Sequence, residues 1–216
     1  MERIKFTFLI LIGLLIASCA VHNRYVPPHW RAQGAAAANI IIVVGFDTRS
    51  PCSGDKAGFH TIMLQSERTH GGIAIDVGMG LAWDYTNSAG KYSIARYSVR
   101  PGKYFLTNPA TSSTTIITAS EKIRLPFEVE AGKTYYLGNF EVYVLSNGKN
   151  IFGQTVPWGF IWLADKSAKP NRAAIKSKFP DVDADNMIRL EGNFSAPPYI
   201  FNDKSLIPKA CLKKSS

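Results

Sequence analysis

The chain has 216 residues, with 25 lysines and arginines against 16 aspartates and glutamates, which gives a formal net charge of +9. This length suits one domain with its own hydrophobic core. The positive charge favours anionic partners, but nothing in the sequence resembles a DNA-reading helix or an RNA-binding aromatic motif, which argues against nucleic acid as the partner.

Residues 1–18 have the order of features that is typical of a secretory signal. Arg3 and Lys5 give a positive start, and residues 6–16 are apolar apart from Thr7 and Gly13. This run is too short to cross a bilayer, which needs about 20 residues. The alternative is a buried N-terminal strand or helix.

The apolar run ends at the tetrapeptide 16–19, Ile-Ala-Ser-Cys, which resembles the lipobox of bacterial lipoproteins. The resemblance implies that residues 1–18 are removed and that Cys19, alkylated with diacylglycerol and then acylated, becomes the N-terminus. It also implies a protein of the cell envelope that the membrane holds through this lipid, with no transmembrane helix. In enterobacterial lipoproteins, Asp directly after the lipidated cysteine favours retention in the inner membrane. This chain has Ala20 at that position, so it resembles lipoproteins that are sorted to the outer membrane. The alternative is an ordinary secretory signal that a cysteine happens to follow.

Residues 19–38 show no hydrophobic period, and they contain Pro27–Pro28 and a Gly-Ala run. We expect them to form a flexible tether.

Strand-like runs follow. They are rich in β-branched or aromatic residues and cover 39–46, 59–65, 80–86, 122–130 and 134–145. In the fourth run Pro126 predicts an edge strand or a bulge, because proline cannot donate to a ladder. In the fifth we expect Tyr136, Phe140, Val142 and Val144 to share one face.

The turn signals Pro101–Gly102 and Ala131–Gly132 each separate two strand-like runs, so we expect both to be hairpins. One short helix is predicted at 170–179, between Pro170 and Pro180, with Ile175 and Phe179 on its apolar stripe. Residues 181–216 are expected to form an extended C-terminal segment.

Two motifs, Pro-Gly-Lys-Tyr-Phe-Leu at 101–106 and Phe-x-Val-x-Ala-Gly-Lys-Thr-Tyr-Tyr-Leu-Gly at 127–138, precede an aromatic strand and a helix that ends in Phe-Pro. Together they resemble envelope lipoproteins with a prealbumin-like or carboxypeptidase-regulatory-like domain, over about residues 95–180. Strand-like runs with turn signals at short spacing predict a sandwich or a barrel, and with this resemblance we expect a mainly β protein with a single antiparallel β-sandwich at 39–180. The resemblance also implies a non-catalytic binding or structural module, since modules of this kind are mostly not enzymes.

If Cys19 carries lipid, Cys52 and Cys211 remain, and an oxidising periplasm permits a disulfide between them. The alternative is two unpaired thiols.

The helix region is strongly basic, which predicts a surface that faces anionic lipid or cell-wall polymer. Its cations are Lys166, Lys169, Arg172, Lys176 and Lys178. The alternative is an ordinary solvated face.

No group of residues in the sequence has a spacing that indicates a particular catalysed reaction. Asp181, Asp183 and Asp185 have the spacing of a calcium loop, but Asn186 and Gly192 stand where that loop needs glycine and glutamate, so we expect no metal and no cofactor. Trp158, Phe160 and Trp162 alternate on one predicted strand, a pattern of core packing that could otherwise stack on sugar rings. The alternative function is an enzyme, or an enzyme accessory, that acts on envelope glycans.

Overall fold

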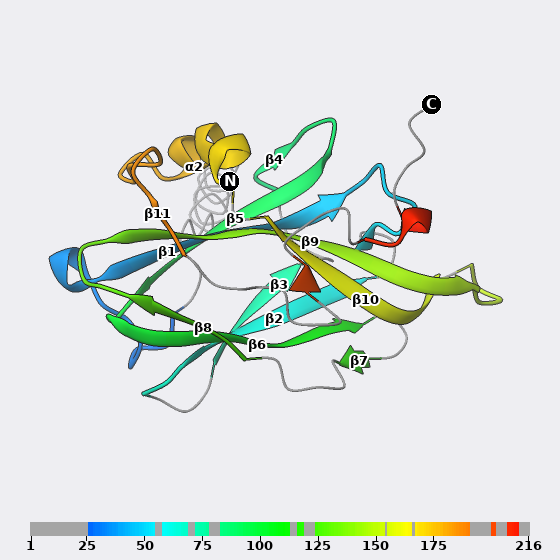
Figure 1. Ribbon diagram of the computed structural model, residues 1–216, viewed down its shortest axis with the longest axis horizontal. Coiled ribbons are helices and arrows are strands. Elements are labelled where there is room, and N and C mark those ends of the chain that lie inside the picture. The colour runs from blue at the N-terminus through cyan, green and yellow to red at the C-terminus, as the bar shows by residue number, and fades with distance from the viewer. Residues whose placement is uncertain are drawn as a thin grey trace, which may run out of the picture.

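The computed structural model describes residues 26–54, 58–68, 72–77, 83–112, 116–118, 124–153, 155–165, 167–190, 200–201 and 207–211. Two β-sheets pack face to face, and a short helix covers the outer side of one of them (Figure 1). Over these described residues, the predicted mainly β fold with one short α-helix is confirmed.

The first sheet has the strand order β12-β10-β9-β1-β5-β4, with β11 beside β9. Its strands are β1 (Ala38–Asp47), β4 (Tyr85–Thr86), β5 (Gly90–Val99), β9 (Thr134–Lys149), β10 (Thr155–Asp165), β11 (Ile188–Arg189) and β12 (Ile200–Phe201). The second sheet has the order β3-β2-β6-β7, with β8 also beside β6. Its strands are β2 (Phe59–Ser66), β3 (Gly72–Val77), β6 (Gly102–Ser112), β7 (Ile116–Thr118) and β8 (Arg124–Val129).

The pairing is not antiparallel throughout. In the described part of the second sheet every pair is antiparallel, but in the first sheet β1 runs parallel to β9, β9 to β11 and β10 to β12. Residue alternation predicts which face a side chain takes, but it carries no information on the direction of the neighbouring strand.

β1 is buried along nearly its whole length, with only Asn39 partly exposed. Ile40, Ile42 and Val44 belong to the core between the sheets, whereas Ile41 and Val43 belong to a second cluster on the outer face. A continuous β-branched run, rather than an alternating one, is what a strand with two buried faces requires.

The helix α2 (Arg172–Lys178) follows the 3₁₀ turn η3 (Lys169–Asn171) and covers one end of that outer face (Figure 1). Ile175 and Phe179, 0% and 1% exposed, pack in the cluster that contains Ile41 and Val43. The stripe predicted for this helix is therefore the face by which it docks.

Neither of the two predicted hairpins forms. Pro101–Gly102 joins β5 in the first sheet to β6 in the second, and Ala131–Gly132 joins β8 in the second sheet to β9 in the first. Gly102 and Gly132 have φ of +145° and +72°, which explains the glycines. A turn signal shows where the chain reverses, but not whether the next strand pairs with the previous one or crosses to the opposite sheet.

A bulge in β9 overturns the expectation that Tyr136 shares a face with Phe140. Ile41 pairs with Tyr136 but Ile42 pairs with Gly138, so β9 contains one extra residue. Gly138 has φ of +143°, and beyond it the faces of the strand are exchanged. Tyr136 therefore lies on the outer face, and Phe140 lies in the core between the sheets.

Residues 26–38 are not a free tether. Trp30 is 2% exposed and packs edge-on against Tyr104, with ring centroids 5.6 Å apart. Its carbonyl accepts a hydrogen bond of 2.8 Å from the amide of Arg100, and the carbonyl of Ala37 accepts one of 2.7 Å from Gly132. The lack of a hydrophobic period hid this packing, because a single tryptophan provides it and not a repeated pattern.

Residues 1–25, which include Cys19 and the rest of the expected tether, lie outside the described residues. Within the described part of the chain, no helix is long and apolar enough to span a membrane. In the expected C-terminal segment, β11 and β12 add short strands to the first sheet, and the 3₁₀ turn η5 (Lys209–Cys211) follows them.

Trp30→Ala is expected to lower the free energy of unfolding by about 3–5 kcal/mol, because it opens a large cavity in the core. Urea denaturation of this variant and of Trp158→Ala, a matched change at a side chain that is 59% exposed, checks this. An equal, small effect in both variants would mean that residues 26–38 do not belong to the folded domain.

Candidate functional site

The cations of the helix region are not free as a group. Lys166 lies outside the described residues. The ammonium group of Lys178 lies 2.6 Å and 2.7 Å from the two carboxylate oxygens of Asp84 and donates to the carbonyl of Ile94 at 2.8 Å. Lys178 therefore joins α2 to β5 and to the residues before β4.

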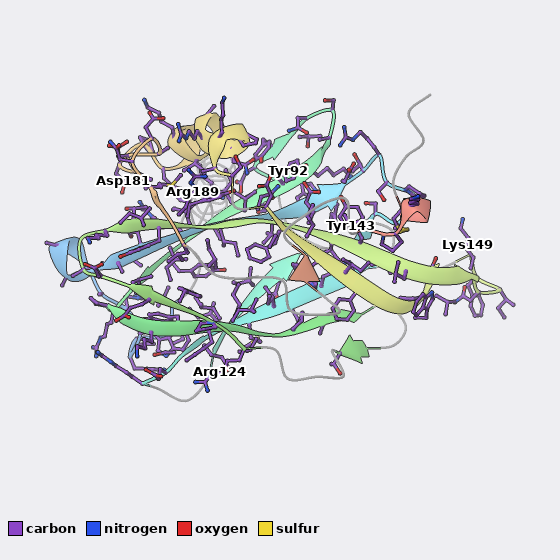
Figure 2. The ribbon with its side chains drawn as sticks, viewed as in Figure 1. Tyr92, Arg124, Tyr143, Lys149, Asp181 and Arg189 are labelled. Atoms are coloured by element: carbon purple, nitrogen blue, oxygen red, sulfur yellow. A yellow bond between two sulfur atoms is a disulfide. The ribbon has the colours of Figure 1, made fainter. Side chains whose placement is uncertain are left out.

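The acidic turn after the helix offsets more of this charge. Arg172 pairs with Asp185 at 3.2 Å, and Asp181 pairs with Arg96 (Figure 2 labels Asp181 beside the helix). Lys169 and Lys176 are exposed, and the described residues offer them no carboxylate within ion-pair distance. The helix face therefore has mixed charge.

The three aspartates that suggested a calcium loop have separate partners. The carboxylate of Asp183 accepts hydrogen bonds from the Asn186 side chain and from the amides of Asp185 and Asn186, and these bonds lower its pKa. Among the described residues, no group of three or more histidines, cysteines or acidic residues is placed to hold a metal ion.

A disulfide joins Cys52 to Cys211 and fixes the C-terminal segment to the loop after β1. Ser50 Oγ donates to the carbonyl of Cys211 at 2.6 Å, and the amide of Val144 donates to the carbonyl of Cys52 at 2.8 Å. Cys211 is 1% exposed and packs with Ile207 against the outer face of the first sheet.

A contact between His60 and Gly54 supports the same loop. The side chain is fully buried, its ring packs edge-on against Phe46, and Nε2 lies 2.9 Å from the carbonyl of Gly54. Since a carbonyl only accepts, Nε2 carries the proton. Burial lowers the pKa of His60 to about 4, so the ring is neutral at physiological pH and has a structural role.

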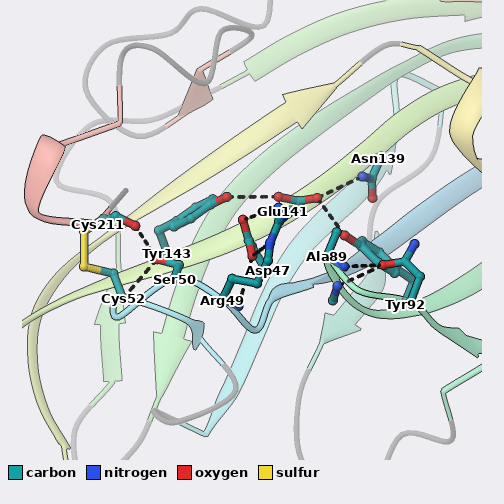
Figure 3. A network of polar contacts seen from close by, with 12 residues as sticks. Asp47, Arg49, Ser50, Cys52, Ala89, Tyr92, Asn139, Glu141, Tyr143 and Cys211 are labelled. Carbon is teal, nitrogen blue, oxygen red and sulfur yellow. Dashed lines mark hydrogen bonds and ion pairs between the residues drawn. A yellow bond between two sulfur atoms is a disulfide. The ribbon is translucent and has the colours of Figure 1, made fainter. Parts of the chain in front are cut away.

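A buried carboxylate lies between the helix and the disulfide on the outer face of the first sheet (Figure 3). The oxygens of Glu141 accept hydrogen bonds from Tyr92 Oη at 3.1 Å, Tyr143 Oη at 3.0 Å and Asn139 Nδ2 at 3.2 Å. Gly45 makes room for the Tyr92 ring, because a Cβ there would lie 2.5 Å from it.

Burial raises the pKa of Tyr92 and Tyr143, so both phenols stay protonated and act as donors. Nearby, Asp47 is also buried, and it pairs with Arg49 at 3.0 Å. Three donors hold the Glu141 carboxylate and a guanidinium holds that of Asp47, which is the arrangement of a structural network.

Three arginines surround an open cavity of about 690 Å³ at the end of the sandwich where the chain crosses between the sheets. They are Arg31 before η1 (Gly34–Ala36), Arg68 after β2 and Arg100 at the Pro101–Gly102 crossing. We call this cavity with its three arginines the arginine pocket. Within the described part of the chain, no carboxylate lies within 4.0 Å of these guanidinium groups.

Backbone contacts position two of these side chains. Arg31 Nη2 donates to the carbonyl of Val26 at 3.2 Å, and Arg100 Nε donates to the carbonyl of Arg31 at 3.4 Å. Glu128 and Glu130 also line the cavity, but Glu130 pairs with Lys133 at 2.7 Å. The three arginines oppose these two glutamates, so the lining carries a net charge of +1, and Lys133 offsets Glu130 from outside the lining.

This pocket is not evident from the sequence alone. Arg31 lay in the expected tether, and Arg68 and Arg100 are far from it in sequence. The available signal was that an arginine directly precedes Pro101–Gly102, but the other two could be added only once the crossing between sheets was known.

Comparison of the chain with protein-family models, with curated proteins and with solved structures finds no match. The function is therefore inferred from the residues and their geometry.

The buried neutral His60 predicts a loss of stability in mild acid. Its pKa is about 4 in the folded protein and 6.5 in the unfolded chain. As the pH falls below 6.5, the unfolded state therefore binds a proton while the folded state does not, and the folded state loses stability. This linkage removes about 2 kcal/mol between pH 7.5 and pH 5. A His60→Gln variant, although less stable at pH 7.5, is expected to lack this part of the pH dependence.

Urea denaturation of both proteins at intervals between pH 7.5 and pH 5 measures the difference. If the variant is too unstable, NMR titration of the wild-type His60 ring gives the same answer. A ring that protonates near pH 6.5 without unfolding contradicts the prediction.

Proposed function

We propose that the protein is a lipid-anchored, non-catalytic binding module of the bacterial envelope that contacts phosphate-bearing groups through the arginine pocket. The anchor is the lipid on Cys19, and the protein is located on the periplasmic side of the outer membrane. The observation that carries the binding role is the group of three guanidiniums around one open cavity, to which no described residue offers a carboxylate within 4.0 Å.

The position of the pocket supports a ligand at the membrane surface. Val26 follows Cys19 by seven positions, and an extended chain of that length spans at most about 25 Å. Val26 is itself a hydrogen-bond partner of Arg31. A lipid at Cys19 therefore keeps the arginine pocket within about 25 Å of the phospholipid headgroups.

Guanidinium groups suit this ligand, because their planar donors bind phosphate oxygens in pairs. Each basic residue near an anionic surface contributes up to about 1 kcal/mol, and salt weakens the attraction. Cell-wall polymers that carry phosphate offer the same chemistry. The two-sheet architecture is compatible with the prealbumin-like or carboxypeptidase-regulatory-like kinship, which we propose on the motifs at 101–106 and 127–138.

The alternative, an enzyme acting on envelope glycans, would need two carboxylates that face a bound sugar. Asp47 and Glu141 are the buried acidic pair on one face of the first sheet, but their oxygens are engaged by Arg49 and by the tyrosines. The structure gives this alternative no specific support.

Mass spectrometry of the protein extracted from membranes is expected to show a chain that begins at Cys19 with added acyl mass. Cys19→Ser should prevent lipid attachment, because only a thiolate is nucleophilic enough to take it. A mature chain that starts at Ala20 or later, without lipid, would contradict the anchor.

Changing Arg31, Arg68 and Arg100 together to Gln is expected to weaken binding to anionic phospholipid vesicles by 10-fold or more, roughly 1.4 kcal/mol or more for three lost cations. Vesicle sedimentation of residues 20–216, which keep every described residue, measures this at low and high salt. The expected weakening disappears at high salt, where screening removes the attraction.

Changing Lys169, Arg172 and Lys176 to Gln is the matched control, since it removes the same charge from the helix face. A large loss in this control, with binding retained in the pocket variant, would move the polyanion contact to the helix. Equal small losses in both would mean that net charge alone drives binding. Parallel measurements with isolated cell wall distinguish polymer from lipid as the source of the phosphate.

A further inference from the structure

The hairpin of β9 and β10 ends in large apolar side chains that the fold leaves in solvent. Ile151 is 93% exposed, Phe152 79%, Trp158 59% and Val156 40%. Figure 2 labels Lys149 at this end, far from the helix and Asp181. We call these four side chains the apolar tip.

Core packing does not account for the apolar tip. Farther along β10, Phe160 and Trp162 are 3% and 0% exposed. The expected core packing of the alternating aromatic residues therefore holds at two of the three positions, and Trp158 lies outside the core. Among the described residues, the one other large apolar side chain exposed to this degree is Ile188, at 40% and on a different part of the surface.

The tip is too small for a stable protein interface. An aromatic side chain offers about 150–250 Å², so the exposed parts of the four side chains sum to roughly 400–500 Å². A stable protein partner needs about 800 Å² on each side. Four side chains that project from the end of a hairpin are better suited to insertion into a soft apolar phase.

The charges beside the tip fit a phospholipid surface. Residues 146–158 contain one cation, Lys149, and no acidic residue. A tryptophan and a lysine beside aliphatic side chains are the combination that the boundary between headgroups and acyl chains favours, because one end of each stays hydrated.

The reach of the anchor determines which bilayer is available. β9 has 16 residues, and at about 3.3 Å per residue it carries the chain roughly 50 Å from the arginine pocket end to the tip. With a linker of at most about 25 Å at the pocket end, the tip is able to reach the same membrane when the long axis of the domain lies along the surface.

We propose that the apolar tip inserts into the interface of the membrane that anchors the chain. The side chains of Ile151, Phe152 and Trp158 enter among the acyl chains, and Lys149 stays with the phosphates. This inference rests on the anchoring part of the proposed function and is independent of the arginine pocket.

The experiment attaches residues 20–216 through an N-terminal histidine tag to vesicles that contain nickel-chelating lipid, so that attachment does not depend on Cys19. The vesicles consist of phosphatidylethanolamine and phosphatidylglycerol with brominated acyl chains, which quench tryptophan in contact with them. Trp30 and Trp162 are buried in the protein, and Trp83 is partly buried against the core between the sheets, so Trp158 is the most exposed tryptophan of the described residues. We expect bromolipid quenching of the wild type, and we expect Trp158→Phe to remove most of it.

The double variant Ile151→Ser with Phe152→Ser tests insertion while the probe stays in place, and most of the quenching of Trp158 is expected to disappear. Ile188→Ser is the matched control and should leave quenching unchanged. Wild-type quenching that is absent, or that survives the double serine change, overturns the inference even if Cys19 is lipidated. Conversely, quenching that depends on the tip supports the inference even if the arginine pocket variant binds vesicles normally.

Discussion

β1 must be covered on both of its faces, because nine of its ten residues are buried and most of them are β-branched or aromatic. Burying one such side chain stabilises the fold by about 1.5–3 kcal/mol relative to exposure. The second sheet covers Ile40, Ile42 and Val44, but it cannot reach the opposite face. The helix α2 is therefore a required layer of the core, since Ile175 and Phe179 cover Ile41 and Val43.

The same requirement explains the C-terminal segment. Beyond the helix, the outer face of the first sheet presents Tyr143, Ile161 and Leu163, which pack with Ile207 and the half-cystine Cys211. The disulfide to Cys52 fixes this second cover. Between the two covers lies the Glu141 network, where tyrosines bring both apolar area and a donor to the carboxylate. A polar group is tolerated there because its oxygens are hydrogen-bonded.

The local sequence pattern predicted which side of each strand and helix is buried. The β-branched run of β1, the alternation and edge proline of β8, and the stripe of Ile175 and Phe179 all describe which side of an element is buried. The bulge at Gly138, the crossings at Gly102 and Gly132, and the burial of Trp30 depend on contacts between segments far apart in sequence. No periodicity records such contacts.

The same distinction explains the candidate site. Counting cations along 166–178 predicted a basic face, but Asp84 and Asp185, which are remote in sequence, neutralise Lys178 and Arg172. The arginines of the pocket are dispersed in sequence, and they gather because two connections cross between the sheets at one end of the sandwich. A charge cluster becomes a candidate binding surface only when the fold does not neutralise it with side chains of opposite charge.

The two ends of the domain together constrain how an anchored molecule is oriented. The arginine pocket lies beside Val26, where the linker from Cys19 enters the fold, and the apolar tip lies roughly 50 Å away along β9. An upright domain would leave four large apolar side chains in water, at a cost that grows with their exposed area. If Cys19 carries lipid as proposed, a domain that lies along the membrane would bring the arginines to the phosphates and the tip to the acyl chains, and a short linker would reduce the entropy lost in adopting that position.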